Sequence, residues 1–180
     1  CRAGALSAAL RLALGIMNRP PRKIVVREAT HEDSQLIAAL TRAAWAGKVS
    51  VTSSGHRETA VIVADHLRDG GGFVLLVDDE PVGSVRWLPL DGGSRTWEVC
   101  RMGVLPAWRG HNLSQHLLEA VIHHGLACGV DEVRLAVRAD QRKLVDFYAS
   151  YEFALAEELE YSHANPLEPP PLVMRRALAW

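Results

Sequence analysis

The stretch Glu98–Ser114 reads EVCRMGVLPAWRGHNLS and decides how the rest of the chain is interpreted. Its first half favours a β-strand, which ends at Pro106. Beyond the loop, apolar residues recur at helical spacing and predict a helix from Leu113 onward. A strand–loop–helix of this kind presents backbone N–H groups at a helix N-terminus, where the macrodipole favours anions. The loop Arg109–Asn112 is therefore predicted to bind an anion, and a phosphate group fits best.

The composition is that of an ordinary globular domain. The chain has 180 residues, 48% apolar and 23% charged, which suits a single domain with a substantial core. A net charge of −1 gives no reason to expect nucleic-acid or membrane-surface binding. Three cysteines without a CxxC pair favour a reducing compartment, so a cytoplasmic location is expected. No uncharged apolar run is long enough to predict a transmembrane helix.

Residues 1–17, CRAGALSAALRLALGIM, are rich in Ala and Leu and contain two arginines and no acid. Three interpretations are open: a targeting or signal-like segment, a lipid-modified N-terminal cysteine, or an appended amphipathic helix with Met17 as the original start. We favour the last and divide the chain into an N-terminal extension, residues 1–21, and a domain at 22–180.

Periodicity and turn residues predict an alternating order of elements after residue 21. A helix begins at Thr30, because Thr30 can cap it and Asp33 approximates a capping box. Turn residues at 78–81 join two strands into a hairpin, and Gly129 ends the central helix. The other predicted helices are at about 57–68, 113–128 and 141–150, and the strands are at 23–28, 73–77, 82–88, 96–105, 132–137, 153–161 and 172–176. The order is β-α-α-β-β-β-α-β-α-β-β, a mixed α/β single domain.

Three motifs in this order resemble the GCN5-related N-acetyltransferase (GNAT) superfamily, over residues 23–178. The segment Val104–Ser114 is similar to the family signature V-x-P-x-[YW]-R-G-x-G-[LI]-[GA]. Phe147–Phe153 is similar to the later F-Y-x-x-x-G-F segment, and Val26–Asp33 to the family's first strand and helix start. The resemblance implies a mixed, mostly antiparallel sheet of about seven strands with helices on both faces.

The motifs depart from the family pattern at five positions. Asn112 replaces the second loop glycine, and asparagine is the non-glycine residue that best tolerates a left-handed backbone. Ser114 replaces a glycine or alanine and could donate its hydroxyl to a phosphate. Ala107 stands where the family often has Gln or Arg, Gln141 where it often has Asn, and Glu152 where it has Gly.

The resemblance implies acetyl-coenzyme A as the donor. Backbone N–H groups from Arg109 to Ser114 would hold its pyrophosphate, with added charge from Arg109. Unpaired backbone groups near Met102 and Val104 would pair with its pantetheine arm. The cofactor-binding candidates are Met102, Gly103, Val104, Arg109, Gly110, His111, Asn112, Leu113, Ser114 and Gln141.

Two residues are candidates for the catalytic chemistry. An ammonium with a pKa of about 10 must lose a proton before it can attack a thioester, so a base is useful. Glu98 matches the position of a catalytic glutamate in several family members; the alternative is a glutamate in a surface ion pair. Tyr148 matches the family's general acid toward the thiolate, and the alternative is a tyrosine that packs its ring in the core.

Other polar residues give weaker signals. Cys100 shares a strand face with Glu98 by alternation, but we expect a small buried hydrophobe rather than a nucleophile. His116 and His123 are about 10 Å apart along the central helix, too far to ligate one metal ion, so no metal is expected. Among residues of the first two helices, Arg42 and Trp45 are candidates for binding the acceptor, beside the Pro-rich loop 163–171. The alternative for Trp45 is a tryptophan that covers the core.

The sequence thus predicts transfer of an acetyl group to a primary amine of a small molecule or peptide, by direct attack in a ternary complex. The family precedent also suggests a homodimer. A non-catalytic acyl-coenzyme A sensor is the alternative that the substitutions at Asn112 and Glu152 leave open. A phosphate site for another nucleotide is less favoured, because neither a GxGxxG after the first strand nor a P-loop lysine is present.

Overall fold

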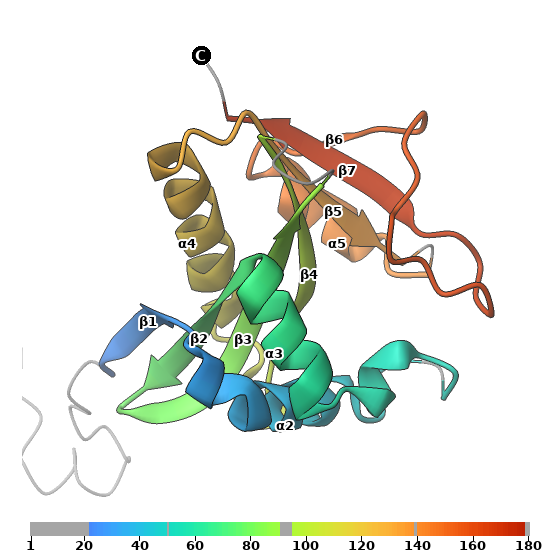
Figure 1. Ribbon diagram of the computed structural model, residues 1–180. Helices are drawn as coiled ribbons and strands as arrows, with labels where there is room; N and C mark the ends of the chain where they lie inside the picture. Colours follow the sequence, from blue (N-terminus) through green and yellow to red (C-terminus); the bar gives the residue numbers. More distant parts are fainter. Residues whose placement is uncertain (1–21, 50, 91–94, 139, 179–180) are drawn as a thin grey trace, which may run out of the picture.

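The protein is described here from a computed structural model, which covers residues 22–49, 51–90, 95–138 and 140–178. The helix expected within residues 1–17 lies outside these ranges. The described chain forms one seven-stranded sheet in the order β1-β2-β3-β4-β5-β7-β6 (Figure 1). Among the described strands, β4 and β5 alone pair in parallel. The strands are β1 (Ile24–Glu28), β2 (Gly71–Val77), β3 (Glu80–Pro89), β4 (Thr96–Val104), β5 (Glu132–Val137), β6 (Ala154–Leu155) and β7 (Leu172–Ala177).

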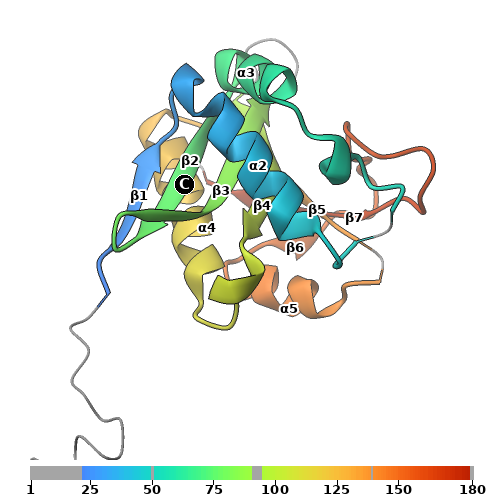
Figure 2. The ribbon, with the colours of Figure 1, turned by 90° about the horizontal axis from the view of Figure 1, so that it is seen from below.

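Within the described ranges, four α-helices cover the two faces of this sheet. The helices α2 (Ser34–Trp45) and α3 (Ala60–Asp69) lie on one face, and α4 (Leu113–Ala127) and α5 (Lys143–Ala149) on the other (Figure 2). β2 shows why the sheet needs both layers. Its residues Phe73, Leu75 and Val77 join the core under α4, whereas Val74 joins the core under α2 and α3. The predicted order of elements and the mixed α/β class are confirmed.

The capping and turn residues predicted from the sequence lie at the ends of the expected elements. The backbone N–H of Thr30 donates to the Asp33 carboxylate at 2.8 Å at the start of the first helix. Asp78 and Asp79 have φ of 51° and 67°, the conformation that a two-residue hairpin requires at both positions. Gly129 follows α4 with φ of 71° and ends it.

The strand predicted at 153–161 is wrong in its length. β6 has only the two residues Ala154 and Leu155, and the chain turns after Ala156, whose N–H donates to the carbonyl of Val173. The segment from Tyr161 to His163 then folds back over β4, where Ser162 and His163 contact the carboxylate of Glu98. Alternating sequence alone does not reveal this competition.

Two irregularities of β4 shape the centre of the molecule. β4 pairs with β5 only from Thr96 to Glu98, and beyond Glu98 the two strands separate. On its other side β4 carries a bulge, since three residues of β4 span the distance that two residues of β3 cover. Arg101 lies in this bulge with φ of 55°.

The described part of the chain contains no helix both long and apolar enough to span a membrane.

Candidate active site

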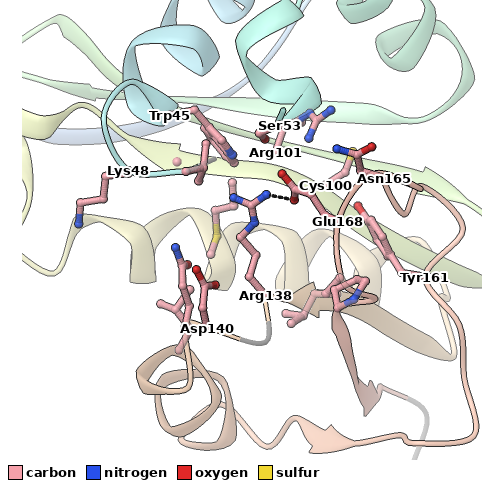
Figure 3. Close-up of a pocket in the computed structure, with 18 of the residues that line it drawn as sticks. Trp45, Lys48, Ser53, Cys100, Arg101, Arg138, Asp140, Tyr161, Asn165 and Glu168 are labelled. Carbon is pink, nitrogen blue, oxygen red and sulfur yellow. Dashed lines mark hydrogen bonds and ion pairs between the residues drawn. The ribbon is translucent and has the colours of Figure 1, made fainter. Parts of the chain in front are cut away.

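A cavity of about 1200 Å³ occupies the space where β4 and β5 separate. Its walls come from the end of α2 and the loop that follows, from β4, from the start of α5 and from the loop 161–171. Figure 3 shows Trp45 and Lys48 on one side of this cavity and Asp140 on another, with Arg138 joined to Glu168 between them. The cleft is thus framed by segments that lie far apart in the sequence.

Half of the cofactor-binding candidates line this cavity: Met102, Gly103, Val104, Arg109 and Gln141. The first three belong to the part of β4 that no longer pairs with β5, so the backbone groups on that side of β4 face the cavity rather than a strand. The Nη2 of Arg109 donates to the carbonyl of Ala44 at 2.5 Å, which ties the loop after β4 to the end of α2.

The predicted anion loop has the expected backbone shape, but beyond Arg109 it does not line the main cavity. Gly110 has φ of 79°, and Asn112 adopts the left-handed conformation with φ of 55° and ψ of 23°. The backbone hydrogen bonds found among the described residues, outside regular helices and strands, use no N–H donor from 110–114. These groups, at the N-terminus of α4, remain available to an anion.

Some candidates of this loop face a second, smaller hollow instead. His111 and Leu113 line an apolar hollow of about 210 Å³ together with Trp108. The guanidinium of Arg22 lies 4.7 Å from the centre of the Trp108 ring, a cation–π contact. Gly110, Asn112 and Ser114 line neither cavity.

Glu98 is buried and does not line the cavity. Its side chain is 1% exposed and accepts hydrogen bonds from the hydroxyl of Ser162, at 2.8 and 2.9 Å to its two oxygens, and from the backbone N–H of Ser162 at 3.3 Å. The Nδ1 of His163 lies 2.6 Å from its Oε1. Glu98 is therefore held by hydrogen bonds inside the protein, rather than by the surface ion pair considered as the alternative.

The sequence interpretation missed the residues that surround Glu98. His163 and Tyr161 both line the cavity, and their rings lie 5.8 Å apart. Burial, followed by the nearby Cys100 and Glu98, raises the pKa of Tyr161. From the sequence, only His163 was placed near the site, as part of the loop 163–171 beside the acceptor. The strand predicted at 153–161 gave no sign that Tyr161 lies at the cavity.

Tyr148 on α5 lines the cavity and is otherwise buried. Burial raises the pKa of its phenol to about 12, so the hydroxyl keeps its proton at neutral pH and can donate it. Its ring also packs against Phe147 and Phe153. The core-packing role and access to the cavity are thus combined in one side chain.

Cys100 lines the cavity, and burial raises the pKa of its thiol to about 11. A thiol held protonated in this way is a poor nucleophile at neutral pH. The Nδ1 of His66 lies 3.9 Å from its Sγ, and burial together with Arg86 lowers the pKa of His66 to about 4. Both groups are therefore neutral near pH 7.

A buried ion cluster, also missed from the sequence, lies beneath the bulge of β4. Glu58, with 1% of its side chain exposed, accepts from Arg101 Nε at 2.7 Å and from Arg86 Nη1 at 3.2 Å. Arg101 also donates to the hydroxyl of Ser54 at 2.7 Å. Because these residues come from β3, β4 and the segment before α3, the cluster fastens the helical layer to the sheet.

The two acceptor-binding candidates have different surroundings. Trp45 lines the cavity, and its ring packs so closely that a Cβ on Gly103 would lie 2.5 Å from it and one on Gly55 2.8 Å. Arg42 does not line the cavity, and its Nη1 donates to the carbonyl of Glu58 at 2.5 Å. Trp45 therefore both holds α2 against β4 and offers an aromatic surface to the cleft.

The Pro-rich loop closes one side of the cavity. Asn165 Nδ2 donates to the carbonyl of Thr52 at 3.0 Å, and the hydroxyl of Thr52 donates to Glu168 at 3.0 Å. Glu168 also pairs with Arg138 at the end of β5. Within the described ranges, no group of three or more His, Cys, Asp or Glu side chains is arranged to hold a metal ion.

Comparison with known proteins identifies the class to which this fold and cleft belong. The profile of the Acetyltransferase (GNAT) family matches residues 35–153, and the chain belongs to this family. A search of curated proteins found no match.

Solved structures share the fold at low sequence identity. The ribosomal-protein-S18-alanine N-acetyltransferase from Escherichia coli is 15% identical, with a TM-score of 0.69 over 88% of this chain and 96% of that one. The PaiA N-acetyltransferase from Thermoplasma acidophilum, in complex with coenzyme A, is 16% identical, with a TM-score of 0.66 over 86% of this chain and 99% of that one. Ard1 from Thermoplasma volcanium is 17% identical, with a TM-score of 0.67 over 87% of this chain and 99% of that one.

Proposed function

We propose that the protein transfers the acetyl group of acetyl-coenzyme A to a primary amine, carried by a small molecule or a peptide terminus, by direct attack within the cleft. Membership of the GNAT family supports acyl-coenzyme A-dependent acetyltransferase activity in general. The coenzyme A bound to the PaiA N-acetyltransferase and the alanine acceptor named for the Escherichia coli enzyme are consistent with this donor and this class of acceptor.

The observation that carries the proposal is the unpaired edge of β4. From Val99 to Val104 this strand lines the cavity, without β5 beside it. A pantetheine arm has the amide groups to hydrogen-bond with such an edge, and backbone donors near Val104 would polarise the thioester carbonyl. The free N–H groups at the start of α4 suit the pyrophosphate.

Two side chains are assigned to proton transfer. The protonated phenol of Tyr148 would give its proton to the departing thiolate as the C–S bond breaks, and would regain a proton from the attacking nitrogen. Glu98 would draw the proton from the acceptor amine, acting through a group that reaches the cavity, since its own carboxylate is 1% exposed.

The proposal is tested by incubating the protein with acetyl-coenzyme A and a panel of primary amines. The panel contains polyamines, arylalkylamines and peptides with free N-termini, and the released thiol and the acetylated product are measured. Tyr148→Phe and Glu98→Gln are expected to lower kcat by about 100-fold, with the dissociation constant for coenzyme A unchanged. Tyr151→Phe is the matched control, because Tyr151 hydrogen-bonds Glu119 away from the cavity.

The outcomes separate the alternatives. Full activity in both variants would contradict the assigned roles. Tight binding of coenzyme A by the wild-type protein without transfer to any amine would instead favour a non-catalytic acyl-coenzyme A sensor.

A further inference from the structure

The carboxylate of Glu98 is surrounded by donors and separated from the cavity. The backbone N–H of Ser162 can only donate, and the hydroxyl of Ser162 contacts both carboxylate oxygens. An ionised carboxylate can only accept hydrogen bonds, so as a carboxylate Glu98 is the acceptor at each of these contacts. The Nδ1 of His163, 2.6 Å from Oε1, must then carry the proton of that hydrogen bond.

His163 is the partner of Glu98 that reaches the cavity. Its side chain is 40% exposed, whereas that of Glu98 is 1% exposed, and His163 lines the cleft. In a neutral imidazole with the proton on Nδ1, the lone pair lies on Nε2, at the opposite side of the ring from the buried carboxylate. Among the described residues, the hydrogen bonds of His163 do not involve Nε2.

Two neighbouring rings pack against the imidazole of His163, and neither contacts the Glu98 carboxylate in its stead. The ring of His66 meets it edge to face at 6.2 Å between centroids, and the ring of Tyr161 lies 5.8 Å away. His66 is turned toward other partners, since its Nδ1 lies 3.1 Å from Arg86 Nη1. The adjacent Ser162 binds the same carboxylate, so Glu98 fixes both the position and the tautomer of His163.

We propose that Nε2 of His163 is the base that accepts the proton of the acceptor amine, and that Glu98 is a positioning residue behind it. This inference rests on the proposed acetyl transfer and identifies the group through which Glu98 acts on the cavity.

Nε2 takes one proton from the ammonium, and the freed amine lone pair forms the C–N bond to the thioester carbonyl carbon. The C–S bond breaks, its electron pair leaves on sulfur, and Tyr148 protonates the thiolate. The second nitrogen proton, lost as the tetrahedral intermediate collapses, restores the proton of Tyr148. The exposed imidazolium of His163 returns its proton to water, so an ammonium and a thioester give an amide, a thiol and one proton.

The kinetic test uses the full chain, acetyl-coenzyme A and whichever amine of the panel is acetylated. His163→Gln is expected to lower kcat by about 100-fold, with little change in the KM for either substrate, as for loss of a general base. Added imidazole should restore part of the rate in His163→Ala, in which space is left for it. His123→Gln is the matched control, because His123 is exposed on α4 and does not line the cavity. A wild-type protein that acetylates the amine while His163→Gln keeps the same kcat would overturn the inference and leave the proposed function intact.

A spectroscopic test is independent of turnover. The ring ¹⁵N shifts of His163, assigned by their loss in His163→Gln, are expected to show a protonated Nδ1 and an unprotonated Nε2 in the neutral imidazole. Glu98→Gln should move this population toward the other tautomer, because an amide can accept or donate. A neutral His163 with its proton on Nε2 in the wild-type protein would refute the assignment, even if no amine were acetylated. Absence of acetylation with the predicted tautomer would contradict the proposed function, and with it the catalytic role of His163, but not the Glu98–His163 geometry.

Discussion

Single polar residues with specific partners fix the local geometry of this protein. Asp33 is an example at the start of the first helix. Its carboxylate accepts from both terminal nitrogens of Arg27, at 2.7 and 2.8 Å, and from the backbone N–H of Thr30. The bidentate contact with Arg27 holds the pKa of Asp33 down to about 2, below its ordinary value of 3.8.

This pKa predicts how stability depends on acid. Because the folded pKa is below the unfolded one, the unfolded chain binds more protons, and the stabilisation is complete above about pH 4 and is lost as the pH falls toward about 2. Asp33→Asn is expected to lower the free energy of unfolding by up to about 2 kcal/mol at neutral pH and to flatten its dependence on pH in that interval. Urea denaturation across this range measures both. Asp65→Asn, in an exposed ion pair with Arg68, should change stability little; an equal effect of the two variants would refute the role of Asp33.

Among the elements, α4 begins in an uncommon way. Asn112 precedes it in the left-handed conformation, where the family signature has glycine. In this conformation the Cβ of a residue lies close to its following carbonyl oxygen, and asparagine adopts it more readily than most other non-glycine residues. The substitution therefore keeps the backbone that exposes the N–H groups of 110–114.

Replacement of Asn112 tests this account of the loop. Asn112→Ala is expected to lower the free energy of unfolding by about 1 kcal/mol, because alanine has the Cβ without the polar group. Asn112→Gly should leave stability close to wild type and retain coenzyme A binding. Thermal and urea denaturation compare the two, with calorimetry for the ligand. Equal stability of the alanine and glycine variants would mean that the left-handed backbone is not required.

At the scale of the whole molecule, the buried cluster around Glu58 joins the helical layer to the sheet. Arg86 is completely buried, and Arg101 is held in the bulge of β4 by the same carboxylate. Removing the negative charge of Glu58 leaves the guanidinium of Arg86 uncompensated inside the protein. The cluster therefore matters more for stability than the exposed ion pairs do.

Glu58→Gln is expected to lower the free energy of unfolding by about 3 kcal/mol. In this variant Arg101, and with it Ser54, should be held less firmly at the wall of the cavity. Chemical denaturation measures the first effect. Glu32→Gln, at an exposed position, is the control and should change stability by less than about 0.5 kcal/mol. A Glu58→Gln variant as stable as this control would show that the cluster is dispensable.

The sequence predicted the parts of the fold that depend on neighbouring residues. Periodicity identified α4 and β5, and turn chemistry placed the hairpin at Asp78 and Asp79. The partners of Glu98 could not be found in this way, because Ser162 and His163 are 64 and 65 positions away. The strand predicted at 153–161 ends at Leu155 instead, and the chain then turns toward the buried carboxylate of Glu98.

The separation of β4 and β5 also affects the protein when no ligand is bound. An unpaired strand edge normally invites another chain to extend the sheet, which leads to aggregation. Here the part of β4 that does not pair with β5 lies within the sheet, between β3 and the diverging β5. The end of α2 and the loop 161–171 lie over it. A second folded sheet cannot reach this edge, because the helix and the loop lie over it. The protein thus keeps an edge open for hydrogen bonding while shielding it from association with its own copies.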